Sequence, residues 1–262
     1  MPDISLIDAH CHLDFPAFDA DRDQVLQRAR EQHIQHIVIP GTQAPFWPRI
    51  TQLCEQHTHL HACYGLHPYW STQHREQDLE SLKDYLDTHP AVAIGECGLD
   101  FRPQQAATEQ DRQRQLAFFE AQLALAQTTG LPLVIHAVHA TEVVIQTIKS
   151  YPGIHGMIHS YSGSLEQAKQ LIDLGFCISI SGAMTRENAK KIRQVVQAIP
   201  LEKLLLETDA PDQPDDKHRG QRNEPAFLLN TLMAVAELRK ESAEQIARQA
   251  SENARRLFKL TC

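Results

Sequence analysis

Two histidines separated by one residue are the first pair in the chain whose type and spacing could bind a metal. They are His10 and His12, and they end the segment that begins with the apolar run Leu6-Ile7. Alternate side chains of a strand point to the same face, so we expect both imidazoles on one side. Two such imidazoles form half of a metal site. Because an isolated pair is more often structural, the metal hypothesis needs further ligands.

Four more residues of metal-ligand type follow apolar runs later in the chain: Glu96, His136, His159 and Asp209. A catalytic zinc usually takes only three protein ligands, so a set of four imidazoles and two carboxylates suits two divalent ions. We expect Glu96 to bridge the ions, because its strand lies midway between the two histidine groups. His10, His12 and Asp209 are then expected to complete one ion, and His136 and His159 the other.

Two ions at such a site would lower the pKa of bound water and polarise a P=O or C=O oxygen. Asp209 can also orient or deprotonate that water, so Asp209 and Glu96 are the candidate catalytic groups. A mixed imidazole and carboxylate site accepts Zn²⁺, Mn²⁺ or Co²⁺, and Mg²⁺ with weaker preference. We therefore expect two divalent cations per chain and leave the metal open.

These residues converge only if the strands that carry them lie in one sheet. Short apolar runs alternate with segments of helical periodicity along the whole chain. The runs expected as strands are residues 6–12, 34–41, 60–64, 91–96, 131–136, 156–159, 176–180 and 204–207. The expected helices are residues 21–33, 47–57, 78–88, 109–129, 141–150, a helix starting at Ser164, and residues 187–198, 225–240 and 242–260.

Eight strand–helix repeats predict a (β/α)8 TIM barrel, with one further helix at the C-terminal end. Barrel active sites lie at the C-terminal ends of the strands, where all six candidate ligands fall. The alternative is a doubly wound open sheet, which would favour a glycine-rich loop after the first strand, where this chain has His-Cys-His. With no linker visible, residues 1–262 are expected to form a single domain.

Composition narrows the classes of function. The net charge is −8, which argues against stable binding along duplex nucleic acid. The six cysteines form no CxxC pair, as expected for reduced thiols. No apolar run is long enough for a membrane span and no signal peptide is visible, so we expect a cytoplasmic protein, acting as a monomer.

Seven segments together resemble the TatD family of metal-dependent deoxyribonucleases and hydrolases, and within it most closely the YjjV-like branch. They cover nearly the whole chain in order. The segments are Asp8-Ala9-His10-Cys11-His12-Leu13, Gly65-Leu66-His67-Pro68, Gly95-Glu96-Cys97-Gly98-Leu99-Asp100, His159-Ser160-Tyr161-Ser162-Gly163, Glu207-Thr208-Asp209-Ala210-Pro211, Arg222-Asn223-Glu224-Pro225 and Asn253-Ala254-Arg255-Arg256-Leu257-Phe258.

The resemblance implies a (β/α)8 barrel of the metallo-dependent hydrolase type and two cations on the six residues above, with Glu96 shared. It also implies phosphodiester hydrolysis in DNA, often from the 3′ end. One position departs from the family, which usually has arginine two residues after the fifth-strand histidine. This chain has Val138 there, which puts substrate contact in doubt.

Other polar residues are expected at the same end of the barrel. His67, Arg219 and Arg222 are candidates for substrate contact, the arginines because their geometry suits phosphate. Glu207 and Asp100 are candidates for orienting the ligands. A turn role for His67, a capping role for Asp100 and a solvated loop for the arginines are the structural alternatives.

The leading hypothesis is a two-metal phosphodiesterase, a deoxyribonuclease or 3′–5′ exonuclease that uses metal-activated water on DNA ends or single strands. The first alternative keeps the site and changes the substrate to a small ester, lactone, amide or phosphoester. The second, from another class, is a metal-binding interaction module without catalysis.

Overall fold

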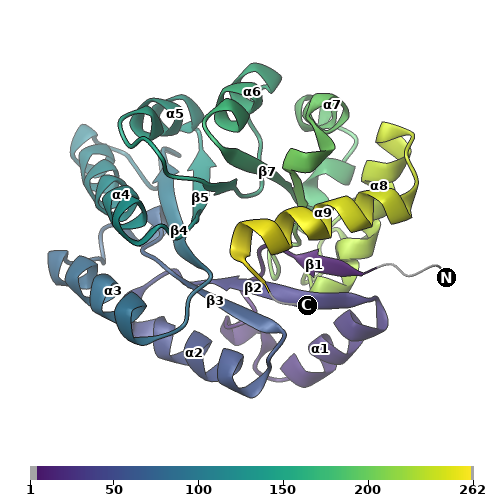
Figure 1. Ribbon diagram of the computed structural model, residues 1–262, viewed down its shortest axis with the longest axis horizontal. Helices are drawn as coiled ribbons and strands as arrows, with labels where there is room; N and C mark the ends of the chain where they lie inside the picture. Colours follow the sequence, from purple (N-terminus) through teal and green to yellow (C-terminus); the bar gives the residue numbers. More distant parts are fainter. Residues whose placement is uncertain (1–4, 261–262) are drawn as a thin grey trace.

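Eight parallel strands follow one another around a single sheet in chain order in the computed structural model, which describes residues 5–260 (Figure 1). Backbone hydrogen bonds from Ala9 N to Leu206 O (3.0 Å) and from Asp209 N to His10 O (2.9 Å) join the last strand back to the first. The predicted barrel is confirmed, and the open doubly wound sheet is excluded. The strands are β1 (Leu6–Asp8), β2 (Ile34–Pro40), β3 (Leu60–Tyr64), β4 (Ala93–Asp100), β5 (Leu133–Val138), β6 (Gly156–Ile158), β7 (Phe176–Ile180) and β8 (Leu204–Leu206).

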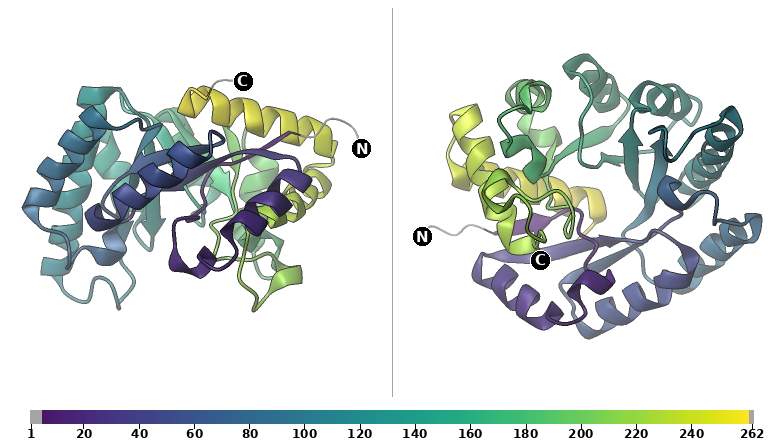
Figure 2. Two further views of the ribbon diagram at one scale, coloured as in Figure 1. Left: turned by 90° about the horizontal axis from the view of Figure 1, so that it is seen from below. Right: turned by 180° about the vertical axis from the view of Figure 1, so that it is seen from behind.

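Helices surround the barrel on the outside (Figures 1 and 2). Outward strand residues such as Ile37 and Ile178 pack against them in one large apolar core. The helices are α1 (Arg22–Glu31), α2 (Trp47–Gln56), α3 (Glu76–Thr88), α4 (Glu109–Thr129), α5 (Thr141–Lys149), α6 (Leu165–Asp173), α7 (Lys190–Ala198), α8 (Leu228–Arg239) and α9 (Ala243–Phe258). No helix in the described range is both long and apolar enough to cross a membrane.

A second apolar cluster fills the interior of the barrel, because alternate residues of each strand point inward. Each of the eight strands contributes one residue, and Ala254, Leu257 and Phe258 of α9 pack against them. Helix α9 therefore closes the N-terminal end of the barrel and leaves the opposite end for the site (Figure 1). The strand residues are Ile7, Val38, Cys63, Ala93, Val134, Met157, Cys177 and Leu205.

Some boundaries differ from the expected ones. Strand β1 ends at Asp8, so His10 and His12 lie beyond the strand and are held by backbone pairing with residues 209 and 210 instead. Asp100 ends β4 and does not lie in the loop after it. Helix α8 begins at Leu228, because residues 225–227 form a 3-10 turn.

Candidate metal centre

The C-terminal ends of the strands bring all six candidate ligands into one buried cluster. His10 and Glu96 are fully buried, and His12, His136, His159 and Asp209 are at most 9% exposed. The segment after β1 reaches the centre because His12 N donates to Ala210 O (2.8 Å) beyond β8. The closed barrel thus brings together His12 and Asp209, which lie nearly 200 residues apart in the sequence.

Strand β4 is irregular where it delivers Glu96. Its register with β5 shifts between Ile94 and Cys97, and the amide of Glu96 donates to Gly41 O (2.8 Å) beyond β2. Gly98 has φ +128°, and a β-carbon there would lie 2.1 Å from the carbonyl oxygen of His136. Only glycine permits this approach, which sets Glu96 beside the end of β5.

Glu96 stands at the centre of the cluster, and its two oxygens face different histidines. Oε2 lies 3.2 Å from Nε2 of His10 and 3.4 Å from Nε2 of His12. Oε1 lies 3.0 Å from Nδ1 of His136 and 3.0 Å from Nε2 of His159. This geometry is the one that a bridging carboxylate requires.

Asp209 lies on the same side as the first histidine pair. Its Oδ1 is 3.5 Å from Nε2 of His10 and 3.7 Å from Nε2 of His12. Its Oδ2 accepts a hydrogen bond from the side-chain amide of Gln213. One oxygen therefore faces the centre while the other is held by the β8 loop.

Two further carboxylates orient the second histidine pair. Asp100 lies 3.2 Å from Nε2 of His136, and Glu207 lies 3.3 Å from Nδ1 of His159. Each can accept an N–H from the nitrogen that faces it, which leaves the other ring nitrogen as a lone pair toward Glu96. The orienting role expected for Asp100 and Glu207 stays a prediction.

His67 adds a histidine to the cluster that the six-ligand set did not include. Its Nε2 is 3.0 Å from Oε1 of Glu96, and its Nδ1 accepts from the amide of Tyr69 at 2.9 Å. Burial lowers the pKa of His67 to about 4, so the ring is neutral at pH 7. A neutral imidazole that accepts at Nδ1 carries its proton on Nε2, so His67 donates to Glu96 in this arrangement, although the atoms of His67, Glu96 and His136 also lie close enough together to hold a metal ion.

The pKa values of Glu96 and of the histidines around it depend on one another. Burial acts to raise the pKa of Glu96, but the imidazoles of His67, His159 and His10 hold it well below its ordinary value. Burial acts to lower the pKa of His12, and the hydrogen bond and charge of Glu96 overcome this and raise it to about 9. The position therefore favours a positive charge, which a metal cation can supply in place of a proton.

The donor atoms fit divalent cations. Nε2 of His10 faces Nε2 of His12 at 3.2 Å, and Nδ1 of His136 faces Nε2 of His159 at 3.2 Å. Two ligands bound to one tetrahedral zinc at about 2.0–2.1 Å lie about 3.3 Å apart. Oε2 of Glu96 is buried and has no hydrogen-bond partner among the described residues. One cation between the nitrogens of each pair would satisfy all four imidazoles, and the cation at His10 and His12 would also satisfy Oε2 of Glu96.

A cavity of about 640 Å³ opens from the cluster to the surface. Phe15, Tyr69 and Trp70 line it on the side of the β1 and β3 loops, and Arg102 and Arg186 also line it. Val138 is half-buried in its wall, while His139 is exposed and does not line it.

The two arginines expected to contact substrate do not line the cavity that opens from the cluster. The guanidinium of Arg222 binds Asp21 through two hydrogen bonds of 2.7 Å and covers the ring of Phe18, away from the cavity. Arg219 is exposed and lines a separate surface cavity with Arg186. Loop position alone misled here, because an acidic partner on the neighbouring loop captures Arg222.

Arg102 and Arg186 reach the cavity instead. Arg102 pairs with Asp100 beside His136, whereas no carboxylate among the described residues pairs with Arg186. Neither arginine was among the substrate contacts expected from the sequence, because nothing local to a loop ranks one of its cations above another. Gln213 was missed altogether, because its position four residues after Asp209 in a loop carries no periodic pattern.

Comparison with known proteins agrees with this geometry. Residues 7–259 match the family model described as TatD related DNase. An uncharacterized metal-dependent hydrolase YjjV of Escherichia coli K12 is 37% identical, covering 96% of this chain and 97% of its own. The 3′-5′ ssDNA/RNA exonuclease TatD of Pantoea ananatis is 34% identical, covering 97% and 100%. The crystal structure of the E. coli YjjV protein superposes with a TM-score of 0.91 at 36% identity over 98% of each chain.

Proposed function

Because the chain belongs to the TatD-related DNase family of metal-dependent hydrolases, we propose that it is a two-metal phosphodiesterase that removes nucleotides from the 3′ end of single-stranded DNA. The observation that carries the proposal is the division of donors between the two oxygens of Glu96. One carboxylate with two imidazoles on each oxygen suits two cations that share a bridge.

We assign one cation to His10, His12 and Asp209 and the other to His136 and His159, with Glu96 shared. Bound together, two divalent cations would supply Lewis-acid polarisation of a phosphoryl oxygen and a lowered pKa of water. The chemistry of the donors does not distinguish Zn²⁺, Mn²⁺, Co²⁺ and Mg²⁺, and metal analysis of the purified protein would identify the native ions.

The chain's own groups have separate roles. Asp209 turns Oδ1 toward His10 and has Oδ2 held by Gln213, so its carboxylate is fixed in place to bind the first cation and to orient the attacking water. His67 donates from Nε2 to Oε1 of Glu96 and so holds that carboxylate in place. Arg186 offers an unpaired cation to phosphate, and the rings of Tyr69 and Trp70 can stack on a base.

The test is nucleotide release from single-stranded DNA labelled at the 5′ or the 3′ end. Metal-replete protein should shorten the 5′-labelled strand stepwise and release mononucleotides from the 3′ label, and a chelator should abolish both. Glu96→Gln should lose metal and activity together, while the exposed control Glu80→Gln should keep both. No hydrolysis with any of the four metals would contradict the proposal.

A small phosphoester remains the second candidate substrate, since Val138 places an apolar side chain in the cavity wall. Comparison of kcat/KM for an oligonucleotide and for a panel of small esters decides between them. Tight metal binding without turnover of either would indicate a binding module. We also propose a cytoplasmic monomer, and sedimentation at micromolar concentration would test the oligomeric state.

A further inference from the structure

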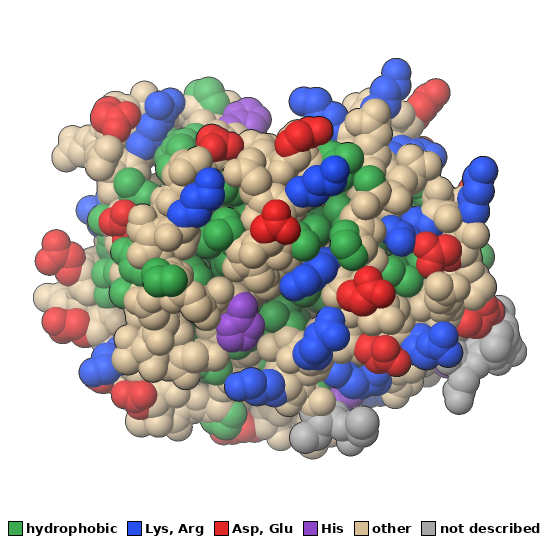
Figure 3. Space-filling view, turned by 45° about the horizontal axis from the view of Figure 1, so that its top comes forward, with side chains coloured by type: hydrophobic (Ala, Val, Ile, Leu, Met, Phe, Trp, Pro, Cys, Tyr) green, Lys and Arg blue, Asp and Glu red, His purple; other side chains and the backbone are tan. Residues whose placement is uncertain are grey.

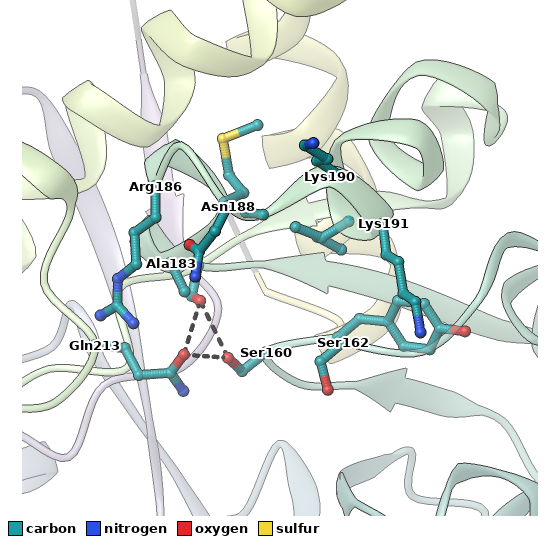
Figure 4. A pocket seen from close by; sticks show the side chains of 13 residues that line it. Ser160, Ser162, Ala183, Arg186, Asn188, Lys190, Lys191 and Gln213 are labelled. Carbon is teal, nitrogen blue, oxygen red and sulfur yellow. Dashed lines mark hydrogen bonds between the residues drawn. The ribbon is translucent and has the colours of Figure 1, made fainter.

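A second cavity, of about 490 Å³, adjoins the cavity of the metal centre. The loop after β6, the loop after β7 and the start of α7 surround it (Figure 4). Four residues line both cavities, namely Ser160, Ser162, Arg186 and Gln213. A molecule bound at the metal centre can therefore continue into this second space.

The charge of the second cavity is opposite to that of the chain. Arg186, Lys190 and Lys191 line it, and no aspartate or glutamate stands among its described lining residues. The chain as a whole carries −8, and acidic and basic side chains are interspersed over the face shown in Figure 3. Glu187 and Asp216 line an adjoining cavity together with Arg186 and Lys190, but the second cavity itself presents three cations and no carboxylate, which favours an anion.

The three cationic side chains of the cavity have no carboxylate partner among the described residues. Nε of Arg186 is buried without a hydrogen-bond partner, and Nη2 of the same guanidinium donates to Pro214 O at 3.5 Å. Neither lysine forms an ion pair with any described residue. Figure 4 shows Arg186 and Lys191 on either side of Ser160 and Ser162. An anion between them would receive several donors at once.

We propose that this cavity binds the nucleotide next to the scissile phosphodiester. Arg186, Lys190 and Lys191 hold the following phosphate of the strand, the one beside the phosphate that reacts. The inference rests on the proposed function and narrows its substrate to a polynucleotide of at least three residues. A polynucleotide carries a charge on every nucleotide, so the phosphate beside the reacting one needs its own cations. The apolar side chains of Met184 and Ile192 can cover the sugar or base. Both cavities have the volume of ordinary ligand pockets, roughly 300–1,000 Å³.

The test measures how kcat/KM depends on chain length. Wild-type protein should gain about tenfold from a thymidine dinucleotide to a trinucleotide, because the longer strand adds a charge-assisted contact. Lys190→Gln combined with Lys191→Gln should lose most of this gain, and the Arg pair at the same positions should keep it. Lys83→Gln combined with Lys149→Gln changes the net charge equally on exposed helix positions and should behave as wild type.

The experiment distinguishes a failure of the proposed subsite from a failure of the proposed function. A gain that survives in the Gln pair, or no gain in wild-type protein, overturns the subsite; a site for free phosphate would also give no gain with length. If no phosphodiester is cleaved, the proposed function fails, and anisotropy of a labelled single-stranded pentanucleotide then decides the subsite. Weaker binding by the Gln pair than by the Lys83 and Lys149 control, with a salt slope lower by about 0.7 per lost phosphate contact, would uphold it. Equal binding would overturn it.

Discussion

Two buried carboxylates face the ring nitrogens of His136 and His159 that point away from Glu96. Oδ2 of Asp100 lies beside Nε2 of His136, and Oε1 of Glu207 lies beside Nδ1 of His159. Glu207 is held in turn by the amide of Ser160 (2.6 Å) and the hydroxyl of Ser179 (2.5 Å). We therefore expect the orientation of the second histidine pair to depend on residues outside the six proposed ligands.

Asp100→Asn should weaken divalent cation binding by about 10- to 100-fold, because an amide holds the N–H of His136 less strongly than a carboxylate does. Titration with a competing chelator measures the affinity. The exposed control Asp84→Asn lies on α3 and should leave it unchanged. Wild-type affinity in Asp100→Asn would show that His136 needs no such support.

Gln213→Leu should lower kcat by about tenfold with a smaller effect on KM, because Oδ2 of Asp209 loses its donor and the carboxylate can rotate. Ser160 and Ser181 donate to Oε1 of Gln213 at 2.8 and 3.3 Å, so the amide is itself fixed. Steady-state kinetics on an oligonucleotide separates kcat from KM. Gln113→Leu on the exposed face of α4 is the control, and an unchanged kcat in Gln213→Leu would remove Gln213 from the mechanism.

At the scale of elements, α9 closes the end of the barrel opposite the candidate metal centre. Its Asn253 donates to the carbonyl oxygens of Leu201 and Leu204, both at 2.8 Å, just where β8 begins. Strand β8 then leads directly to Glu207 and Asp209. Helix α9 thus anchors the strand that supplies part of the site.

Asn253→Ala should lower the free energy of unfolding by about 1–3 kcal/mol, because buried carbonyl groups lose their donor. Urea denaturation of metal-free protein measures the change without the contribution of ligand binding. Glu252→Ala, one residue away on the exposed side of α9, should shift the free energy of unfolding by less than about 0.5 kcal/mol. Equal effects of the two substitutions would contradict the anchoring role.

At the scale of the whole molecule, the closed end carries a titratable pair well apart from the metal ligands. Nδ1 of His36 and Nε2 of His61 lie 2.9 Å apart near the starts of β2 and β3. Burial lowers the pKa of His36 and lowers that of His61 from 6.5 to about 4, and Arg255 of α9 contributes at His36. Both rings are therefore neutral in the folded protein at pH 7.

Stability should fall as the pH drops from about 6.5 toward 4, because the unfolded chain binds protons at these histidines while the folded chain does not. Above pH 6.5 both states are neutral and the contribution is constant. His61→Gln should reduce this slope, measured as the free energy of unfolding against pH in a chelator. The exposed control His33→Asn should keep the wild-type slope, and an equal slope in His61→Gln would refute the assignment.

Much of the molecule was predictable from local pattern. Apolar runs and helical periodicity identified the eight strands and nine α-helices of residues 5–260, since burial on both faces of a parallel sheet leaves a direct mark on sequence. Because active sites of (β/α)8 barrels lie at the C-terminal ends of the strands, the six residues of metal-ligand type were then expected to lie together. Strand ends were less exact, as at His10 and His12, because the pairing that holds them comes from residues 209 and 210.

The sequence by itself determined which residue types stand at the strand ends, because ligand chemistry and strand pattern are local properties. Only the tertiary structure decided that His67 donates to Glu96, that Arg222 is captured by Asp21, and that Arg186 opens into a cationic cavity. Each of these outcomes depends on distances between loops far apart in the chain. Loop side chains choose partners by proximity, and proximity exists only after the barrel has closed.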